Sequence, residues 1–114
     1  MINYKEQYLL HCENLNSGTT KEDIKKHNNA MRQLAKLYHK IEKENNKTFL
    51  LELLQNSNER TQALVAAHCL GLGIYIPESK KVLTIIAKNK RNQPLAFEAQ
   101  STLNIWKQQG YLKF

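Results

Sequence analysis

The chain carries the same pattern of apolar side chains twice, and this internal repeat constrains its fold more than any other feature. The first copy, within residues 48–72, consists of Phe49, Leu50, Leu53, Leu54, Ala63, Leu64, Ala66 and Leu70. The second copy, within residues 81–105, lies 33 positions later and consists of Val82, Leu83, Ile86, Ala87, Ala96, Phe97, Ala99 and Leu103. Repeats of roughly this length are typical of stacked helical hairpins, because one hairpin cannot bury its apolar face alone and its neighbours complete the core.

Apolar periodicity predicts two further helices before the repeat. Apolar side chains spaced by three or four follow residues 3–15, and we expect this helix to end at Gly18. Thr20 and Asp23 have the spacing of a capping box, so a long helix should begin at Thr20 and extend to about residue 43. Its expected apolar face consists of Ile24, His27, Met31, Leu34, Tyr38 and Ile41, with Ala30 and Leu37 alongside.

Several short stretches carry a family resemblance. They are His27-Asn28-Asn29, Leu50-Leu51-Glu52-Leu53-Leu54, Ala66-Ala67-His68-Cys69-Leu70, Ala96-Phe97-Glu98-Ala99, and Leu103-Asn104-Ile105-Trp106 with Gly110 after it. At these residues the chain resembles a bacterial family of small all-helical proteins known as domain of unknown function number two thousand and nineteen, which is itself similar to HEAT and armadillo repeats. The resemblance implies a HEAT-like α-α superhelix and brings no catalytic residues with it. Proteins of this kind occur among the immunity proteins, which bind and silence a cognate bacterial toxin.

The repeat and the two preceding helices together predict the fold class. We expect one all-α domain over residues 1–114, built as a HEAT-like α-α superhelix of about six helices. Residues 1–44 should form an N-terminal helical pair, and residues 48–72 and 78–108 should form two stacked HEAT-like hairpins. The last hairpin has no polar cap after it, so its apolar end is open to a second copy, and we expect a monomer or a weak homodimer.

Composition places the chain among ordinary folded proteins without a membrane span. No apolar run approaches the ~20 residues that a spanning helix needs, and the first seven residues lack the apolar stretch of a signal peptide. We therefore expect a cytoplasmic protein that does not bind membranes. The two cysteines, Cys12 and Cys69, are too few for a disulfide framework and should be buried free thiols.

The strongest charge feature lies between Glu78 and Glu98, where five cations occur without an acidic residue. They are Lys80, Lys81, Lys88, Lys90 and Arg91, and they supply most of the formal net charge of +7. Three interpretations stay open: a solvated face that prevents self-association, a surface for an acidic protein partner, and a surface for nucleic acid. These five residues are the candidate partner-binding site.

Motifs for catalysis, metal binding or cofactor binding do not occur in the sequence. There is no GxSxG elbow, no glycine-rich phosphate loop and no HExxH, and the four histidines do not have ligand spacing. We therefore expect a non-enzymatic protein-binding module without a cofactor, and the resemblance favours an immunity protein that neutralises a toxin. The alternative is a nucleic-acid-binding protein that uses the basic segment 80–91. Trp106 continues the apolar face of the repeat and should pack in the core.

Overall fold

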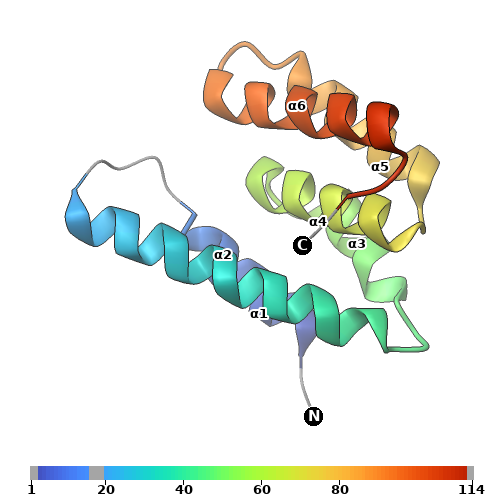
Figure 1. The fold of residues 1–114 in the computed structure, drawn as a ribbon, viewed down its shortest axis with the longest axis horizontal. Coiled ribbons are helices and arrows are strands. Elements are labelled where there is room, and N and C mark those ends of the chain that lie inside the picture. The colour runs from blue at the N-terminus through green and yellow to red at the C-terminus, as the bar shows by residue number, and fades with distance from the viewer. Residues whose placement is uncertain (1–2, 16–19, 113–114) are drawn as a thin grey trace. The chain divides into compact units, whose positions relative to one another are not determined.

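The computed structural model describes residues 3–15 and 20–112, and these residues form an all-α fold (Figure 1). The helices are α1 (Tyr4–Glu13), α2 (Lys21–Glu42), α3 (Thr48–Asn56), α4 (Glu59–Leu72), α5 (Ile76–Ala87) and α6 (Gln93–Gln109). No strand occurs among the described residues, so the predicted all-α class is confirmed. Helix α1 ends at Glu13, and the predicted helix end at Gly18 lies outside the described residues.

The chain divides into two compact units, Met1–Phe49 and Leu50–Phe114. The first contains α1, α2 and the start of α3, and the second contains the rest of α3 with α4, α5 and α6. Each unit is described by itself below. A single domain over the whole chain stays a prediction.

In the first unit, helix α1 packs against helix α2, and both helices begin at side-chain caps. The Asp23 backbone N–H donates to the Thr20 hydroxyl oxygen over 3.0 Å, as the capping-box spacing predicts. The Tyr4 hydroxyl donates to a Glu44 carboxylate oxygen over 2.7 Å, and the Tyr4 ring stacks on Phe49 with centroids 5.3 Å apart. The hydrogen bond to Glu44 raises the pKa of Tyr4, and together these contacts hold α1 against the segment that enters α3.

The predicted apolar face of α2 is only partly buried. Leu34, Tyr38 and Ile41 are buried, whereas Ile24 is 50% exposed and Met31 is 43% exposed. The difference follows from helix length, because α1 has 10 residues and α2 has 22. At about 1.5 Å per residue, α1 can cover less than half of its neighbour.

In the second unit, helix α5 packs against both α4 and α6, and α4 also contacts α6. Helices α5 and α6 occupy the range expected for the second hairpin. Helices α3 and α4 follow each other over the range expected for the first hairpin, but α4 packs most closely on α5 rather than on α3. The HEAT-like stacking of two hairpins therefore stays a prediction.

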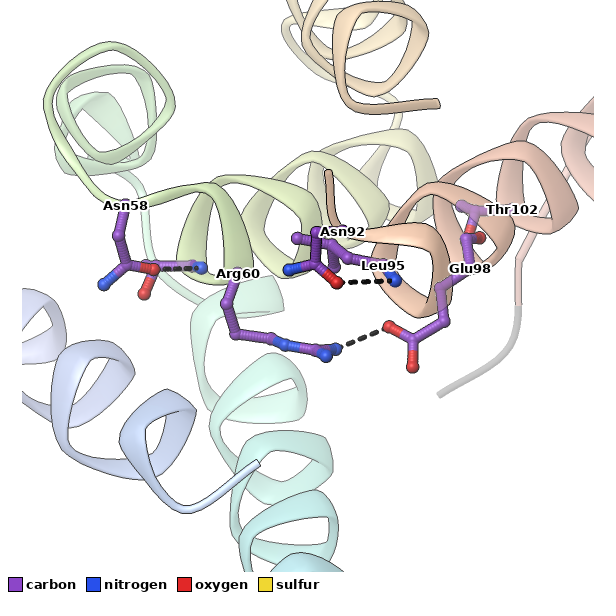
Figure 2. A network of polar contacts seen from close by, with 7 residues as sticks. Asn58, Arg60, Asn92, Leu95, Glu98 and Thr102 are labelled. Atoms are coloured by element: carbon purple, nitrogen blue, oxygen red, sulfur yellow. Dashed lines mark hydrogen bonds and ion pairs between the residues drawn. The ribbon is translucent and has the colours of Figure 1, made fainter. Parts of the chain in front are cut away.

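Polar contacts fix the amino-terminal ends of α4 and α6 (Figure 2). The Asn58 side chain accepts from the Thr61 backbone N–H over 2.9 Å, and the Asn92 side chain accepts from the Leu95 N–H over 3.3 Å. Between the two helices, Arg60 forms an ion pair with Glu98, with Nη1 and Oε2 2.5 Å apart. The start of α4 is thereby tied to the first turns of α6.

One apolar position of the second repeat is exposed to solvent rather than buried or half-buried. Phe97 on α6 is 74% exposed, whereas its counterpart Leu64 on α4 is half-buried. The expectation of a buried Phe97 was wrong because burial of a repeat position depends on the helices that follow it. Helix α4 is followed by α5 and α6, which pack against it, whereas no described helix follows α6.

Candidate partner-binding surface

Helix α5 and the turn after it carry the five cations that the sequence singles out. Helix α4 ends at Gly73, whose φ of +75° is the left-handed conformation that glycine adopts without strain. Tyr75 then precedes α5 with a φ of +48°, which is uncommon for a residue with a side chain, and Pro77 lies in the first turn. These residues reverse the chain so that α5 runs back along α4.

The turn between α5 and α6 is held by one asparagine. The Asn89 side-chain amide donates to both carboxylate oxygens of Glu59, over 3.0 and 2.8 Å. The Asn89 carbonyl oxygen in turn accepts from the Arg91 backbone N–H over 3.0 Å. The backbone that carries Lys88, Lys90 and Arg91 is therefore anchored to the start of α4.

Four of the five predicted residues are exposed together on α5 and this turn, namely Lys81, Lys88, Lys90 and Arg91. We call these four residues the basic surface. Lys80 differs, because its side chain is half-buried and its Nζ lies 5.3 Å from the centroid of the Trp106 ring on α6. This cation–π contact holds α5 to α6 and is worth about 0.5–1 kcal/mol at a site of this kind. Trp106 is itself only half-buried.

One carboxylate, Glu59, lies beside the turn of the basic surface, where it accepts from the neutral Asn89 amide and keeps its charge. Glu98 pairs with Arg60, and Glu78 lies in the first turn of α5, at the opposite end of this helix from Lys88. Within residues 3–15 and 20–112, none of the four cations of the basic surface makes an ion pair. Their charges are therefore open to an external partner.

An apolar side chain that the sequence analysis missed lies inside the basic surface. Ile85 is 60% exposed, and it follows Lys81 by four residues and precedes Lys88 by three, so the three side chains share one face of α5. The signal in the sequence was weak: Ile85 is apolar but lies outside the repeated positions. An exposed isoleucine between lysines suits a protein surface better than a phosphate backbone.

The buried thiols offer no reactive group beside this surface. Cys12 and Cys69 are buried and are not joined in a disulfide, as predicted. Burial raises the pKa of Cys69 to about 12; the neighbouring Glu78 charge adds to this rise, and the Ser79 hydroxyl opposes it. A thiol with this pKa remains protonated and unreactive at neutral pH.

The described residues contain neither a cluster of metal ligands nor a helix that could span a membrane. No group of three or more His, Cys, Asp or Glu side chains is placed to hold a metal ion in the part of the chain that the structure describes. None of the helices within that part has the length and apolar character needed to cross a bilayer.

Comparison of the chain with protein-family models, with curated proteins and with solved structures found no match in any of the three. The resemblance to the helical family of unknown function therefore stays a prediction.

Proposed function

We propose that the protein is a non-enzymatic binding module whose basic surface engages an acidic surface of a partner protein. The observation that carries the proposal is the group of four exposed cations, Lys81, Lys88, Lys90 and Arg91, which make no ion pair among the described residues. Two of them, Lys81 and Lys88, flank the exposed Ile85 on α5. Such a surface attracts an acidic partner over about 10 Å and orients it before contact. The apolar side chain at its centre then supplies short-range affinity.

Within this class, we propose that the protein neutralises a toxin by covering part of its surface. The absence of catalytic motifs from the sequence and the family resemblance support this assignment. Inhibition by occlusion needs no chemistry from the inhibitor, only a surface complementary to the toxin. The complementary surface on the toxin should be acidic, since the formal net charge of this chain is +7.

The direct test uses a toxin domain encoded beside the gene for this protein. Replacing the four cations of the basic surface by glutamine should weaken binding at least about tenfold and abolish protection of cells that express the toxin. A matched control replaces four exposed lysines of α2, Lys25, Lys26, Lys36 and Lys40, by glutamine, which removes the same charge from another place. If both variants lose binding equally, the net charge of the chain, and not the position of the basic surface, controls the affinity. Unchanged binding in the basic-surface variant would place the interface elsewhere.

Nucleic acid is the second candidate, supported by the absence of acidic residues between Glu78 and Glu98. Each neutralised phosphate releases counterions, so affinity for a duplex or single-stranded probe would fall steeply as salt rises. A titration at about 50 and 200 mM salt separates the two candidates. Probe binding that the basic-surface variant weakens would favour nucleic acid, and no probe binding at the lower salt would remove that candidate.

A further inference from the structure

The outer side of α6 carries a row of three uncharged residues spaced by four. Phe97 is 74% exposed, Ile105 is 46% exposed, and the small residue Ser101 lies between them. Residues four apart form a ridge along one side of a helix, and this ridge extends for about 12 Å. We call Phe97, Ser101 and Ile105 the α6 ridge.

The same row occurs on α4, where it is mostly covered. The residues 33 positions before the three residues of the α6 ridge are Leu64, His68 and Leu72 on α4. His68 is only 1% exposed, and Leu64 and Leu72 are half-buried, on a helix that packs against α5 and α6. Within the repeat, therefore, this row lies on a helix that is covered from two sides. On α6 the row remains largely in solvent.

We propose that the α6 ridge is the interface of a homodimer, in which the α6 helices of two copies pack antiparallel and cross at Ser101. Charge disfavours a second copy at the basic surface and opposes it less at α6. Helix α6 carries only two charged side chains, Glu98 and Lys107, and Glu98 is already paired with Arg60. Two copies that each carry a net charge of +7 can meet along this helix, whereas their basic surfaces repel each other.

The spacing of the ridge is self-complementary. Ridges formed by residues four apart interdigitate when helices cross at about −50°, which is the commonest packing class in globular proteins. The small Ser101 at the crossing point lets the two backbones approach, and antiparallel packing places Phe97 of one copy against Ile105 of the other. A parallel arrangement would instead bring the two basic turns together, with Lys90 and Arg91 of both copies at the same end. Antiparallel packing keeps these turns at opposite ends.

The predicted dimer is weak and is strengthened by salt. One crossing helix pair should bury less than the roughly 1,200 Å² that separates stable from transient interfaces, so the dimer should be of the transient class. Salt screens the repulsion between the two cationic copies and leaves the apolar contact unchanged. Self-association should therefore increase with salt, whereas binding of an acidic partner to the basic surface should decrease.

Sedimentation equilibrium of the full chain up to about 1 mM, at low salt and at about 0.5 M salt, tests the proposal. We expect a monomer–dimer equilibrium that salt shifts toward dimer. Phe97→Ser should weaken self-association at least tenfold, and Ile85→Ser, which removes a similarly exposed apolar side chain from α5, should leave it unchanged. A wild-type monomer under all conditions, or equal effects of the two substitutions, would overturn the proposal.

Cross-linking tests the crossing point itself. A Ser101→Cys variant should form a disulfide-linked dimer under mild oxidation much faster than a Thr84→Cys variant, whose cysteine would be exposed on α5. The native thiols do not interfere, because Cys12 and Cys69 are buried. Equal rates for the two variants would show that α6 does not cross its copy at Ser101. The outcome is independent of the proposed function, since Phe97→Ser leaves the basic surface intact.

Discussion

Substitution of Leu83 by alanine should unfold the second unit at a much lower denaturant concentration. Leu83 is 1% exposed in the middle of α5, the helix that packs against both α4 and α6. The substitution removes about three carbon groups, worth about 0.8 kcal/mol each when buried. The cavity left behind adds about 24 cal/mol per Å³, or roughly 1.5 kcal/mol for a void of about 60 Å³. The expected loss is therefore about 4 kcal/mol of unfolding free energy.

Urea unfolding followed by the fluorescence of Trp106, the one tryptophan of the chain, measures this loss in the second unit. With a slope of about 1.5–2 kcal/mol per M, the midpoint should fall by about 2–2.7 M. Ile85→Ala is the matched control, because Ile85 lies two residues away on the same helix and is 60% exposed. The Ile85→Ala variant should lose less than about 0.5 kcal/mol of unfolding free energy. Losses of similar size in the two variants, or a loss below about 1 kcal/mol for Leu83→Ala, would refute the packing of α5 described above.

Three further predictions concern the polar contacts and the thiol of the second unit. Asn58→Ala removes the cap of α4 and should cost about 1 kcal/mol in the same urea assay, whereas Asn58→Gly should cost only a few tenths. A double-mutant cycle with Arg60→Ala and Glu98→Ala should give a coupling of only about 0.2–1 kcal/mol, because both side chains are partly exposed; a larger value would mean that solvent screens the pair less than this exposure implies. Cys69 should react with a thiol reagent at pH 8 only after unfolding. Since its pKa rises from 9.0 to about 12 on folding, its contribution to stability should be complete below pH 9 and lost as the pH rises through 12, and Cys69→Ala should flatten this alkaline decline.

The helices could be predicted because their signals are local. The Thr20 cap lies within one helical turn of the backbone N–H that it satisfies, and the same holds for the caps at Asn58 and Asn92. Helix α6 ends before Gly110, which has a φ of +77°, a conformation that glycine adopts readily. Apolar periodicity then indicates which side of each helix faces inward. These signals need no knowledge of the neighbouring helices.

The exposed apolar residues could not be predicted, because their exposure depends on what covers them. Ile24 and Met31 have the periodicity of a buried face, but α1 is too short to cover them. Phe97 has the same repeat position as Leu64, yet no described helix follows α6. Periodicity shows the direction of a side chain relative to its own helix. Coverage depends on the length and order of other elements, which periodicity does not encode.

The candidate site was predicted in position but not in detail. Charge clustering indicated the region 80–91, and four of its five cations are exposed there. The cation–π contact between Lys80 and Trp106 could not be predicted, since these residues are 26 positions apart and meet only because α5 packs on α6. Ile85 was missed because it lies outside the repeated apolar positions, and its exposure depends on which sides of α5 the helices α4 and α6 cover.

The two proposed surfaces of the second unit are linked by charge. The basic surface on α5 and its turn attracts acidic partners and repels a second copy, so at low salt it favours the hetero-complex and disfavours the homodimer. The α6 ridge, which has no charge of its own, depends on burial of Phe97 and Ile105 and is opposed by the net charge of the two copies. Replacing the four cations of the basic surface by glutamine should therefore change the two associations in opposite directions. It should weaken partner binding and strengthen self-association at low salt, and this second effect should vanish once salt has screened the repulsion. If the substitutions weaken both associations, one surface rather than two mediates them.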